Sequence, residues 1–144
     1  MTRYLLDTNI ISNTIKPEPS PYLAAWFQAQ MDEDLFIAAS TIAEIRRGIL
    51  IMPVGRKRDD LETWFLGTRG PLAFFAGRIL PFEENAALVW AKLMADGRAA
   101  GQQRDPMDML IASVAIANEC IIVTHNEVDF WGLDLINPLR SETR

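Results

Sequence analysis

The sequence contains few of the residues that build disulfides and zinc centres. Among its 144 residues there are one cysteine, Cys120, and one histidine, His125. A single cysteine has no partner for a disulfide within the chain, and the two residues together are too few for a zinc site made of His and Cys ligands. The scarcity of cysteine is typical of a cytoplasmic protein, and we expect this one to act in the cytoplasm.

Long apolar runs and an excess of positive charge are also missing. No apolar run approaches the roughly 18 residues that a membrane-spanning helix needs, and the N-terminus lacks the pattern of a secretory signal. The 19 acidic residues outnumber the 14 basic ones and give a net charge of −5, unlike a protein that coats DNA. We therefore expect no membrane insertion, and any contact with nucleic acid must be local.

Short apolar runs are what the sequence has in quantity. Hydrophobic residues make up 49% of a chain whose length suits one compact domain, so we predict a single domain over residues 1–144. Five runs predict β-strands, at residues 3–6, 34–40, 78–82, 120–124 and 133–137. Helical periodicity occurs between them, at residues 22–31, after Thr41, and at residues 59–66, 83–101 and 107–119. This alternation favours an α/β fold with a mostly parallel sheet covered on both faces.

Acidic residues occupy the positions where such folds bind ligands, beyond the carboxyl ends of the strands. Asp7 follows the first strand directly, and Glu44 lies near the start of the helix after the second strand. Asp108 lies in the first turn of the helix before the fourth strand, while Asn126 and Asp129 follow that strand. We expect these side chains to meet at one edge of the sheet.

Such a cluster of acids predicts a bound metal ion. Three or four carboxylates at one place repel one another and take up protons unless a cation neutralises them. Because an all-oxygen ligand set suits Mg²⁺ or Mn²⁺, we predict that Asp7, Glu44 and Asp108 hold one of these ions. A site of this kind can activate water and stabilise the charge of a phosphodiester under attack, so the pattern predicts phosphodiester hydrolysis.

Each acid also has a structural interpretation. Asp7 and Asp129 could stabilise turns. Glu44 could belong to a capping box at the start of its helix, and Asp108 could interact favourably with a helix dipole. Asp105, the residue before a proline, competes with Asp108, and we predict that Asp105 caps the helix.

Four stretches resemble the successive motifs of the PIN domain: LLDTNIIS, STIAEIRRG, DPMDMLIASVA and IIVTHNEVDF. They span about residues 4–130, and the subgroup that they resemble most is the VapC-like ribonuclease toxins. The resemblance implies a PIN-like three-layer α/β/α fold with a central parallel sheet of about five strands. It implies cleavage of RNA with Mg²⁺ or Mn²⁺, frequent homodimerisation, and a cognate VapB-like antitoxin encoded beside the toxin.

Matched by position, the resemblance assigns the metal ligands to the same residues. Asp7 corresponds to the first-strand ligand, Glu44 to the acid of the AE motif, and Asp108 to the acid before LIA. The sequence departs from the most acidic form of the pattern after the fourth strand, where Asn126 stands and the next carboxylate is Asp129. Either residue could complete the site, and the departure weakens the case for a second metal ion.

Other functions compete with this one. A PIN-like module that binds RNA or protein without cutting is compatible with Asn126. A hydrolase based on His125 lacks a Gly-x-Ser-x-Gly elbow, and an aspartyl-phosphate phosphatase would need an acid where Asn9 stands. We therefore favour a metal-dependent endoribonuclease, the toxin of a VapBC-type toxin-antitoxin system.

Polar, basic and aromatic residues suggest further contacts. Thr8, Asn9 and Thr124 could orient ligands or simply stabilise turns. Arg47 could pair with Glu44, three residues earlier. A basic set could contact the RNA backbone: Arg46, Arg47, Arg56, Lys57 and Arg58. An aromatic set could belong to the core or, as the resemblance implies, line a groove for the antitoxin: Trp64, Phe65, Phe74 and Phe75.

Overall fold

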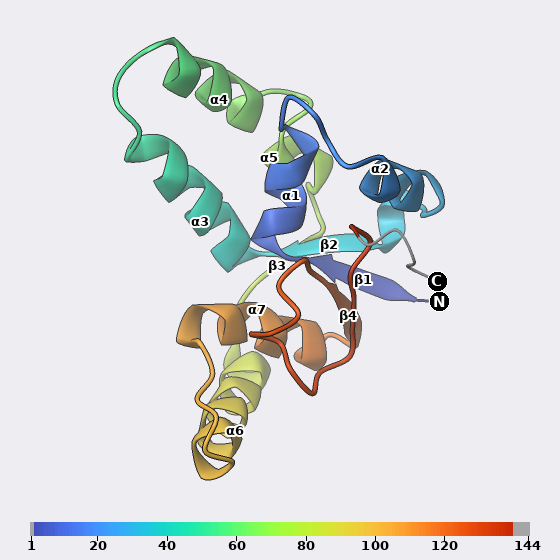
Figure 1. Ribbon diagram of the computed structural model, residues 1–144, viewed down its shortest axis with the longest axis vertical. Helices are drawn as coiled ribbons and strands as arrows, with labels where there is room; N and C mark the ends of the chain where they lie inside the picture. The colour runs from blue at the N-terminus through green and yellow to red at the C-terminus, as the bar shows by residue number, and fades with distance from the viewer. Residues whose placement is uncertain (1, 140–144) are drawn as a thin grey trace.

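The computed structural model describes residues 2–139, which form a five-stranded sheet with parallel strand pairs (Figure 1). The strands are β1 (Arg3–Leu6), β2 (Leu35–Ala38), β3 (Ile79–Leu80), β4 (Cys120–Val123) and β5 (Leu135–Ile136). Each lies within a run predicted to be a strand, although β3 and β5 are only two residues long. Their order across the sheet is β3-β2-β1-β4-β5.

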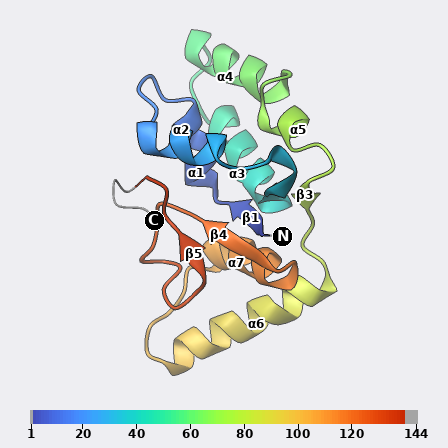
Figure 2. The same ribbon diagram turned by 90° about the vertical axis from the view of Figure 1, so that its right-hand side faces the viewer.

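Within these residues, seven α-helices and the 3-10 helix η1 (Asp32–Asp34) connect the strands. The helices are α1 (Thr8–Thr14), α2 (Pro21–Gln28), α3 (Ala39–Leu50), α4 (Arg56–Leu66), α5 (Pro71–Phe74), α6 (Glu84–Ala99) and α7 (Pro106–Ala117). Helices α1 to α5 lie on one side of the sheet, and α6 and α7 cover the other (Figure 2). The predicted three-layer α/β/α fold is therefore confirmed. None of these helices is long and apolar enough to cross a membrane.

The core has two halves, one on each face of the sheet, because successive residues of a strand point to opposite sides. In β1, Leu5 packs in the cluster that includes α6 and α7 residues, whereas Leu6 packs in the cluster that includes α1 and α3 residues. Both leucines are fully buried. The strands are therefore apolar on both faces, which is why they appear in the sequence as continuous apolar runs.

Three helix starts differ from the predictions. Helix α1 was not predicted, because its seven residues follow β1 directly and are too few to show a period. Helix α3 begins at Ala39 immediately after β2, so it starts before Thr41, after which the helical period was predicted. Helix α4 begins at Arg56, three residues before the predicted start at Asp59.

Arg78 connects α5 and η1 with the edge of the sheet. Its Nη1 atom donates to the carbonyl oxygens of Asp32 and Leu35, both at 2.5 Å, and its Nη2 atom donates to the carbonyl oxygen of Phe74. The guanidinium also lies over the rings of Phe74 and Phe75, 5.1 and 5.3 Å from their centroids. One side chain thus satisfies carbonyl groups from three segments.

Replacing this arginine should destabilise the fold. Hydrogen bonds from charged groups typically contribute about 1.5–3 kcal/mol, so we expect Arg78→Met to lower the free energy of unfolding by about that amount. Urea denaturation followed by circular dichroism measures the change. The exposed Arg69 provides the matched control, and equal losses in Arg78→Met and Arg69→Met would contradict the role assigned to Arg78.

The order of the strands determines where a ligand would bind. From β1 the chain proceeds to β2 and β3 on one side, and it later returns to place β4 and β5 on the other side. The sheet therefore has a topological switch point between β1 and β4. In open α/β sheets, the crevice beyond the carboxyl ends of the strands at such a point is the usual binding site.

Candidate active site

Asp7 lies at this switch point, directly after β1, and is held in place by the end of β4 and the start of α1. Its N–H donates to the carbonyl oxygen of Val123 at 2.8 Å, which joins β1 to β4. Its Oδ1 accepts from the N–H of Thr8 at 2.7 Å, and its Oδ2 accepts from Thr124 Oγ1 at 2.7 Å and Asn9 Nδ2 at 3.1 Å. The residue is only 4% exposed. Asn9 and Thr124 therefore hydrogen-bond Asp7 through their side chains. Thr8 hydrogen-bonds Asp7 through its N–H and Glu44 through its hydroxyl group.

Burial raises the pKa of Asp7 above its usual value of 3.8, while the hydrogen bonds from Thr124, Thr8 and Asn9 oppose the rise. Ion pairs in the described part of the chain join Arg46 with Glu62 and Lys92 with Asp96. Neither pair includes an acid of the site. The buried carboxylate is thus hydrogen-bonded but forms no ion pair with any Lys or Arg among the described residues.

Glu44 faces Asp7 from helix α3. Thr8 Oγ1 donates to Glu44 Oε1 at 3.0 Å and lies 3.4 Å from the hydroxyl oxygen of the fully buried Thr41. Burial, together with the charges of Asp7 and Asp105, raises the pKa of Glu44, and the hydrogen bond from Thr8 opposes this. The sequence did not reveal Thr41 as a part of this network, because its contact with Thr8 joins residues 33 positions apart.

Two predictions about Glu44 were wrong. It is the sixth residue of α3, too far along the helix to form a capping box at its start. Arg47 does not pair with it in the described chain. Instead the neighbouring Arg46 forms an ion pair with Glu62 at 3.0 Å, which joins α3 to α4. The carboxylate of Glu44 is therefore directed to Thr8 and the site.

Asp108 enters the site from the first turn of α7. The prediction that Asp105 caps this helix is confirmed, since Asp105 Oδ1 accepts from the N–H groups of Met107 and Asp108, both at 2.9 Å. Burial, which is the largest cause, and the negative charges of Asp105, Asp7 and Asp129 together raise the pKa of Asp108 from its usual value of 3.8 to about 7. A hydrogen bond with Asp129 adds to the effect. The acid of α7 thus interacts with those of β1 and of the loop after β4.

Asn126 and Asp129 form a small turn beside Thr124. Asn126 Nδ2 donates to Asp129 Oδ2 at 2.8 Å, and the Asp129 N–H donates back to Asn126 Oδ1 at 3.3 Å. The Asn126 N–H donates to Thr124 Oγ1 at 2.9 Å, the same hydroxyl that donates to Asp7. Asn126 therefore orients Asp129, and Asp129 is the member of the pair that contacts Asp108.

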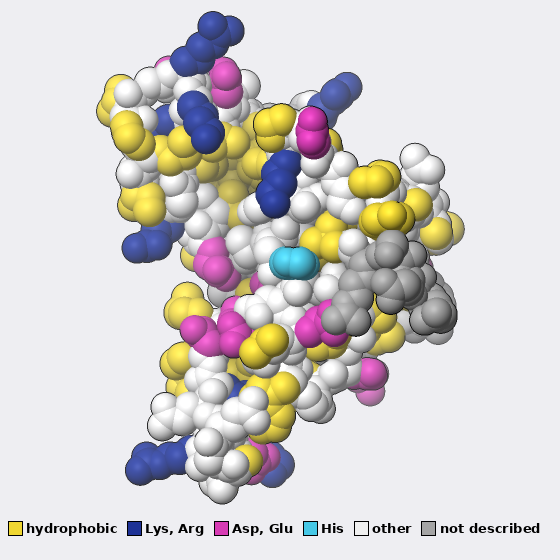
Figure 3. Space-filling view, in the orientation of Figure 1, with side chains coloured by type: hydrophobic (Ala, Val, Ile, Leu, Met, Phe, Trp, Pro, Cys, Tyr) yellow, Lys and Arg dark blue, Asp and Glu magenta, His cyan; other side chains and the backbone are white. Residues whose placement is uncertain are grey.

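His125 lies on the same face as acidic side chains, near the middle of the molecule (Figure 3). It is exposed, and its backbone N–H donates to Asn9 Oδ1 at 3.2 Å. This contact ties the loop after β4 to the start of α1. The histidine thus contributes to the site through its backbone.

The side chains of the site are of the chemical type that binds a divalent cation, but their present positions do not form a complete metal site. Buried carboxylates that also raise one another's pKa, and that form no ion pair with a Lys or Arg in the described part of the chain, favour a bound Mg²⁺ or Mn²⁺. Yet within residues 2–139 no three His, Cys, Asp or Glu side chains are placed to hold a metal ion. Asp7 and Glu44 are engaged by hydroxyl groups, and Asp108 interacts with Asp129. Binding would therefore require small side-chain rotations that exchange these hydrogen bonds for metal contacts.

The raised pKa of Asp108 predicts how stability depends on pH. Between the usual value of 3.8 and about 7, the folded protein binds a proton that the unfolded chain releases, so stability falls as pH rises through this window. Asp108→Asn cannot ionise. In EDTA we expect it to raise the melting temperature at pH 8 and to give a clearly smaller gain at pH 5. Asp134→Asn, at an exposed aspartate, is the control, and equal gains at both pH values would contradict the assignment.

The fold and the site together define a three-layer α/β/α domain with an acidic centre at the switch point of a parallel sheet. The family model of the PIN domain matches residues 4–130. The chain therefore belongs to the PIN domain family.

Several relatives match almost the whole chain. VapC ribonuclease Y4jK of Sinorhizobium fredii is 39% identical, and the plasmid stability protein StbB of Pseudomonas syringae is 38% identical. Each match covers 136 residues, 93% of this chain and 96% of the relative. Among solved structures, FitAcB from Neisseria gonorrhoeae is similar, with a TM-score of 0.86 and 31% identity over 94% of this chain and 97% of that one.

Proposed function

We propose that this protein is a metal-dependent endoribonuclease and the toxin of a VapBC-type toxin-antitoxin system. The observation that carries the proposal is the convergence of Asp7, Glu44 and Asp108 at the switch point, where burial raises the pKa of each acid and no Lys or Arg among residues 2–139 forms an ion pair with them. The names of the relatives, a VapC ribonuclease and the toxin FitB, support it. We place its action in the cytoplasm.

The proposed mechanism gives each residue of the site a task. Asp7, Glu44 and Asp108 would hold Mg²⁺ or Mn²⁺, and the chemistry that such an ion would supply is polarisation of a water molecule and stabilisation of charge on the phosphodiester. Thr124 and Asn9 orient Asp7, and Thr8 orients Glu44.

Asp129 completes the site in this mechanism. It is exposed, it contacts Asp108, and Asn126 holds its carboxylate in place. An exposed carboxylate beside the ligands is suited to accept a proton from the attacking water.

Cleavage of labelled total tRNA and structured RNAs by the purified protein tests the proposal. We expect cutting with Mg²⁺ or Mn²⁺ and none with EDTA. A calorimetric titration with Mn²⁺ should detect binding in the absence of RNA. If the protein neither binds Mn²⁺ nor cuts any RNA, the nuclease proposal fails and a PIN-like binding module replaces it.

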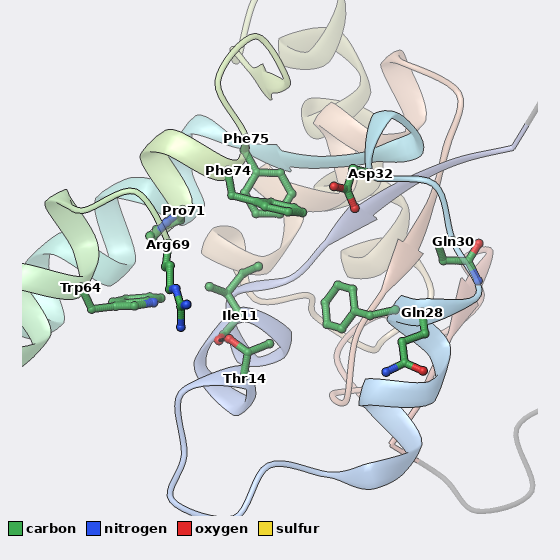
Figure 4. Close-up of a pocket in the computed structure, with 12 residues that line it drawn as sticks. Ile11, Thr14, Gln28, Gln30, Asp32, Trp64, Arg69, Pro71, Phe74 and Phe75 are labelled. Carbon is green, nitrogen blue, oxygen red and sulfur yellow. Dashed lines mark hydrogen bonds between the residues drawn. The ribbon is translucent and has the colours of Figure 1, made fainter.

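A groove on the side of the sheet that carries α1 to α5 is our proposed docking site for a VapB-like antitoxin. The cavity measures about 510 Å³ and lies between α1, α2 and the α4–α5 region (Figure 4). Its apolar lining includes Ile11, Phe27, Trp64, Phe74 and Phe75. An apolar trough of this kind suits the apolar face of an amphipathic segment.

Polar residues at the groove and the burial of its aromatic residues refine this proposal. Thr14, Asp32 and Arg69 also line the cavity and can pair with polar groups of the bound segment. Phe65, which the sequence grouped with the groove aromatics, does not line the cavity and belongs to the core, whereas Phe75 belongs to the core and also lines the cavity. The groove therefore uses three of the four predicted aromatic residues.

We further propose that RNA contacts the arm formed by α3 and α4, which extends from the body (Figure 1). Arg47, Arg56 and Lys57 are exposed there and can bind phosphates without disturbing the core. Arg46 is less available because it pairs with Glu62. We also propose a homodimer of single-domain subunits, which light scattering coupled to size exclusion can test.

A further inference from the structure

Arg104, in the loop between α6 and α7, has an unusual environment for an arginine. It is 9% exposed, and its guanidinium carbon lies 3.7 Å from the ring centroid of Trp131. Its Nε and Nη1 atoms are buried and have no hydrogen-bond partner among the described residues. Burying unpaired donors of a charged group costs free energy, so the indole face is the principal interaction that holds the side chain.

One glycine makes room for this side chain. A Cβ atom on Gly97 of α6 would lie 2.9 Å from Arg104 Cγ and 3.0 Å from the carbonyl oxygen of Gln102, so its neighbours would have to shift. On the other side, Gly132 follows Trp131 with a φ of 75°, a conformation that favours glycine. The absence of a side chain at position 97 thus leaves the space that Arg104 occupies.

The stack joins the two segments that carry Asp108 and Asp129. Arg104 immediately precedes Asp105, the residue that caps α7 and so fixes the first turn in which Asp108 lies. Trp131 comes two residues after Asp129, and Phe130 between them is fully buried in the core. Movement of Trp131 away from Arg104 would therefore carry Asp129 away from the start of α7.

We propose that the stack of Arg104 on Trp131 is a positioning element of the acidic site, which keeps the side chain of Asp129 within hydrogen-bonding distance of Asp108. Among the described residues, Arg104 forms no hydrogen bond or ion pair with the acids of the site, and it acts through the loop that carries Asp129. The proposal rests on the proposed function, because the acids that it positions are those of the proposed metal centre.

Substitutions that keep or remove the stacking face test the proposal. Arg104→Met keeps the aliphatic stem and loses the charge, and Trp131→Leu loses the aromatic face that Trp131→Phe keeps. We expect Arg104→Met and Trp131→Leu to speed amide hydrogen exchange in residues 126–132 and to weaken Mn²⁺ binding about tenfold, as loss of a supporting residue typically does. Trp131→Phe, which keeps an aromatic face for Arg104, should recover most of both properties.

The controls separate positioning from a merely structural role. Arg98→Met, at an exposed arginine in the last turn of α6, should change neither readout. Unchanged hydrogen exchange in Arg104→Met and Trp131→Leu would overturn the proposal. Faster exchange with unchanged Mn²⁺ affinity would also overturn it, because the stack would then support the loop without positioning the acids. If Arg104→Met does not fold, the comparison of Trp131→Leu with Trp131→Phe decides.

The same experiment distinguishes this proposal from the proposed function. A wild-type protein that binds no Mn²⁺ contradicts the metal centre, whatever the exchange data show. In that case the hydrogen exchange of residues 126–132 alone reports whether the stack restrains the loop, and equal exchange in all variants would exclude any such role.

Discussion

Asp7→Asn is expected to reduce metal-dependent RNA cleavage by at least about a hundredfold, because a metal ion contributes several kcal/mol to the transition state and each 1.36 kcal/mol is tenfold in rate. The fold should persist. Asp7 is the N-cap of α1, and asparagine caps helices about as well as aspartate. The change also removes a buried carboxylate, whose raised pKa indicates that its charge is poorly compensated. Initial rates on labelled RNA with Mn²⁺, with melting temperature measured alongside, test this expectation.

Asp134→Asn is the matched control for the same measurement. Asp134 is an exposed aspartate outside the site and outside the arm of α3 and α4, so its substitution should leave the rate within about twofold of the wild type. If Asp7→Asn cut RNA as fast as Asp134→Asn does, the carboxylate at the switch point would not be part of the catalyst. The binding-module interpretation would then be favoured.

Phe74→Glu is expected to weaken the complex with the antitoxin by about thirtyfold or more, since an aromatic residue that anchors an interface typically contributes at least 2 kcal/mol. Phe74 lines the groove and is 38% exposed, so a glutamate there places a charge where an apolar side chain should dock. RNA cleavage by the free protein should persist. Titration calorimetry with the product of the adjacent reading frame measures the affinity.

Phe82→Glu provides a matched comparison, because Phe82 is also aromatic and exposed, at 43%, but does not line the groove. Its affinity for the antitoxin should equal that of the wild type. Equal weakening by Phe74→Glu and Phe82→Glu would place the antitoxin elsewhere. Loss of cleavage in Phe74→Glu alone would instead indicate that the substitution disturbs the site.

The sequence predicted the layers of the fold because parallel strands covered on both faces are apolar without interruption. The bounds of short elements were less predictable. β3 and β5 each pair through two residues, and pairing depends on the neighbouring strand more than on local sequence. Helix α1 has too few residues for a helical period to be visible.

Parts of the candidate site were predictable and others were not. Asp7, Glu44 and Asp108 were found from their positions after strands or near helix starts, and the structure brings them near one another. The contact of Thr8 with Thr41 and that of Arg104 with Trp131 join residues far apart in the chain. Such contacts depend on tertiary packing, which no local pattern records.

The hydrogen bond from Thr124 to Asp7 spans 117 residues and has a consequence for the protein during its own synthesis. Strand β1 leaves the ribosome early, but the hydroxyl that orients Asp7 and the strand that pairs with β1 at the switch point are translated much later. Contacts this distant in sequence form last, since the chain must first be present to close the loop. A nascent chain therefore cannot assemble the acidic centre until β4 has emerged, so the site forms only when synthesis of the chain is nearly complete.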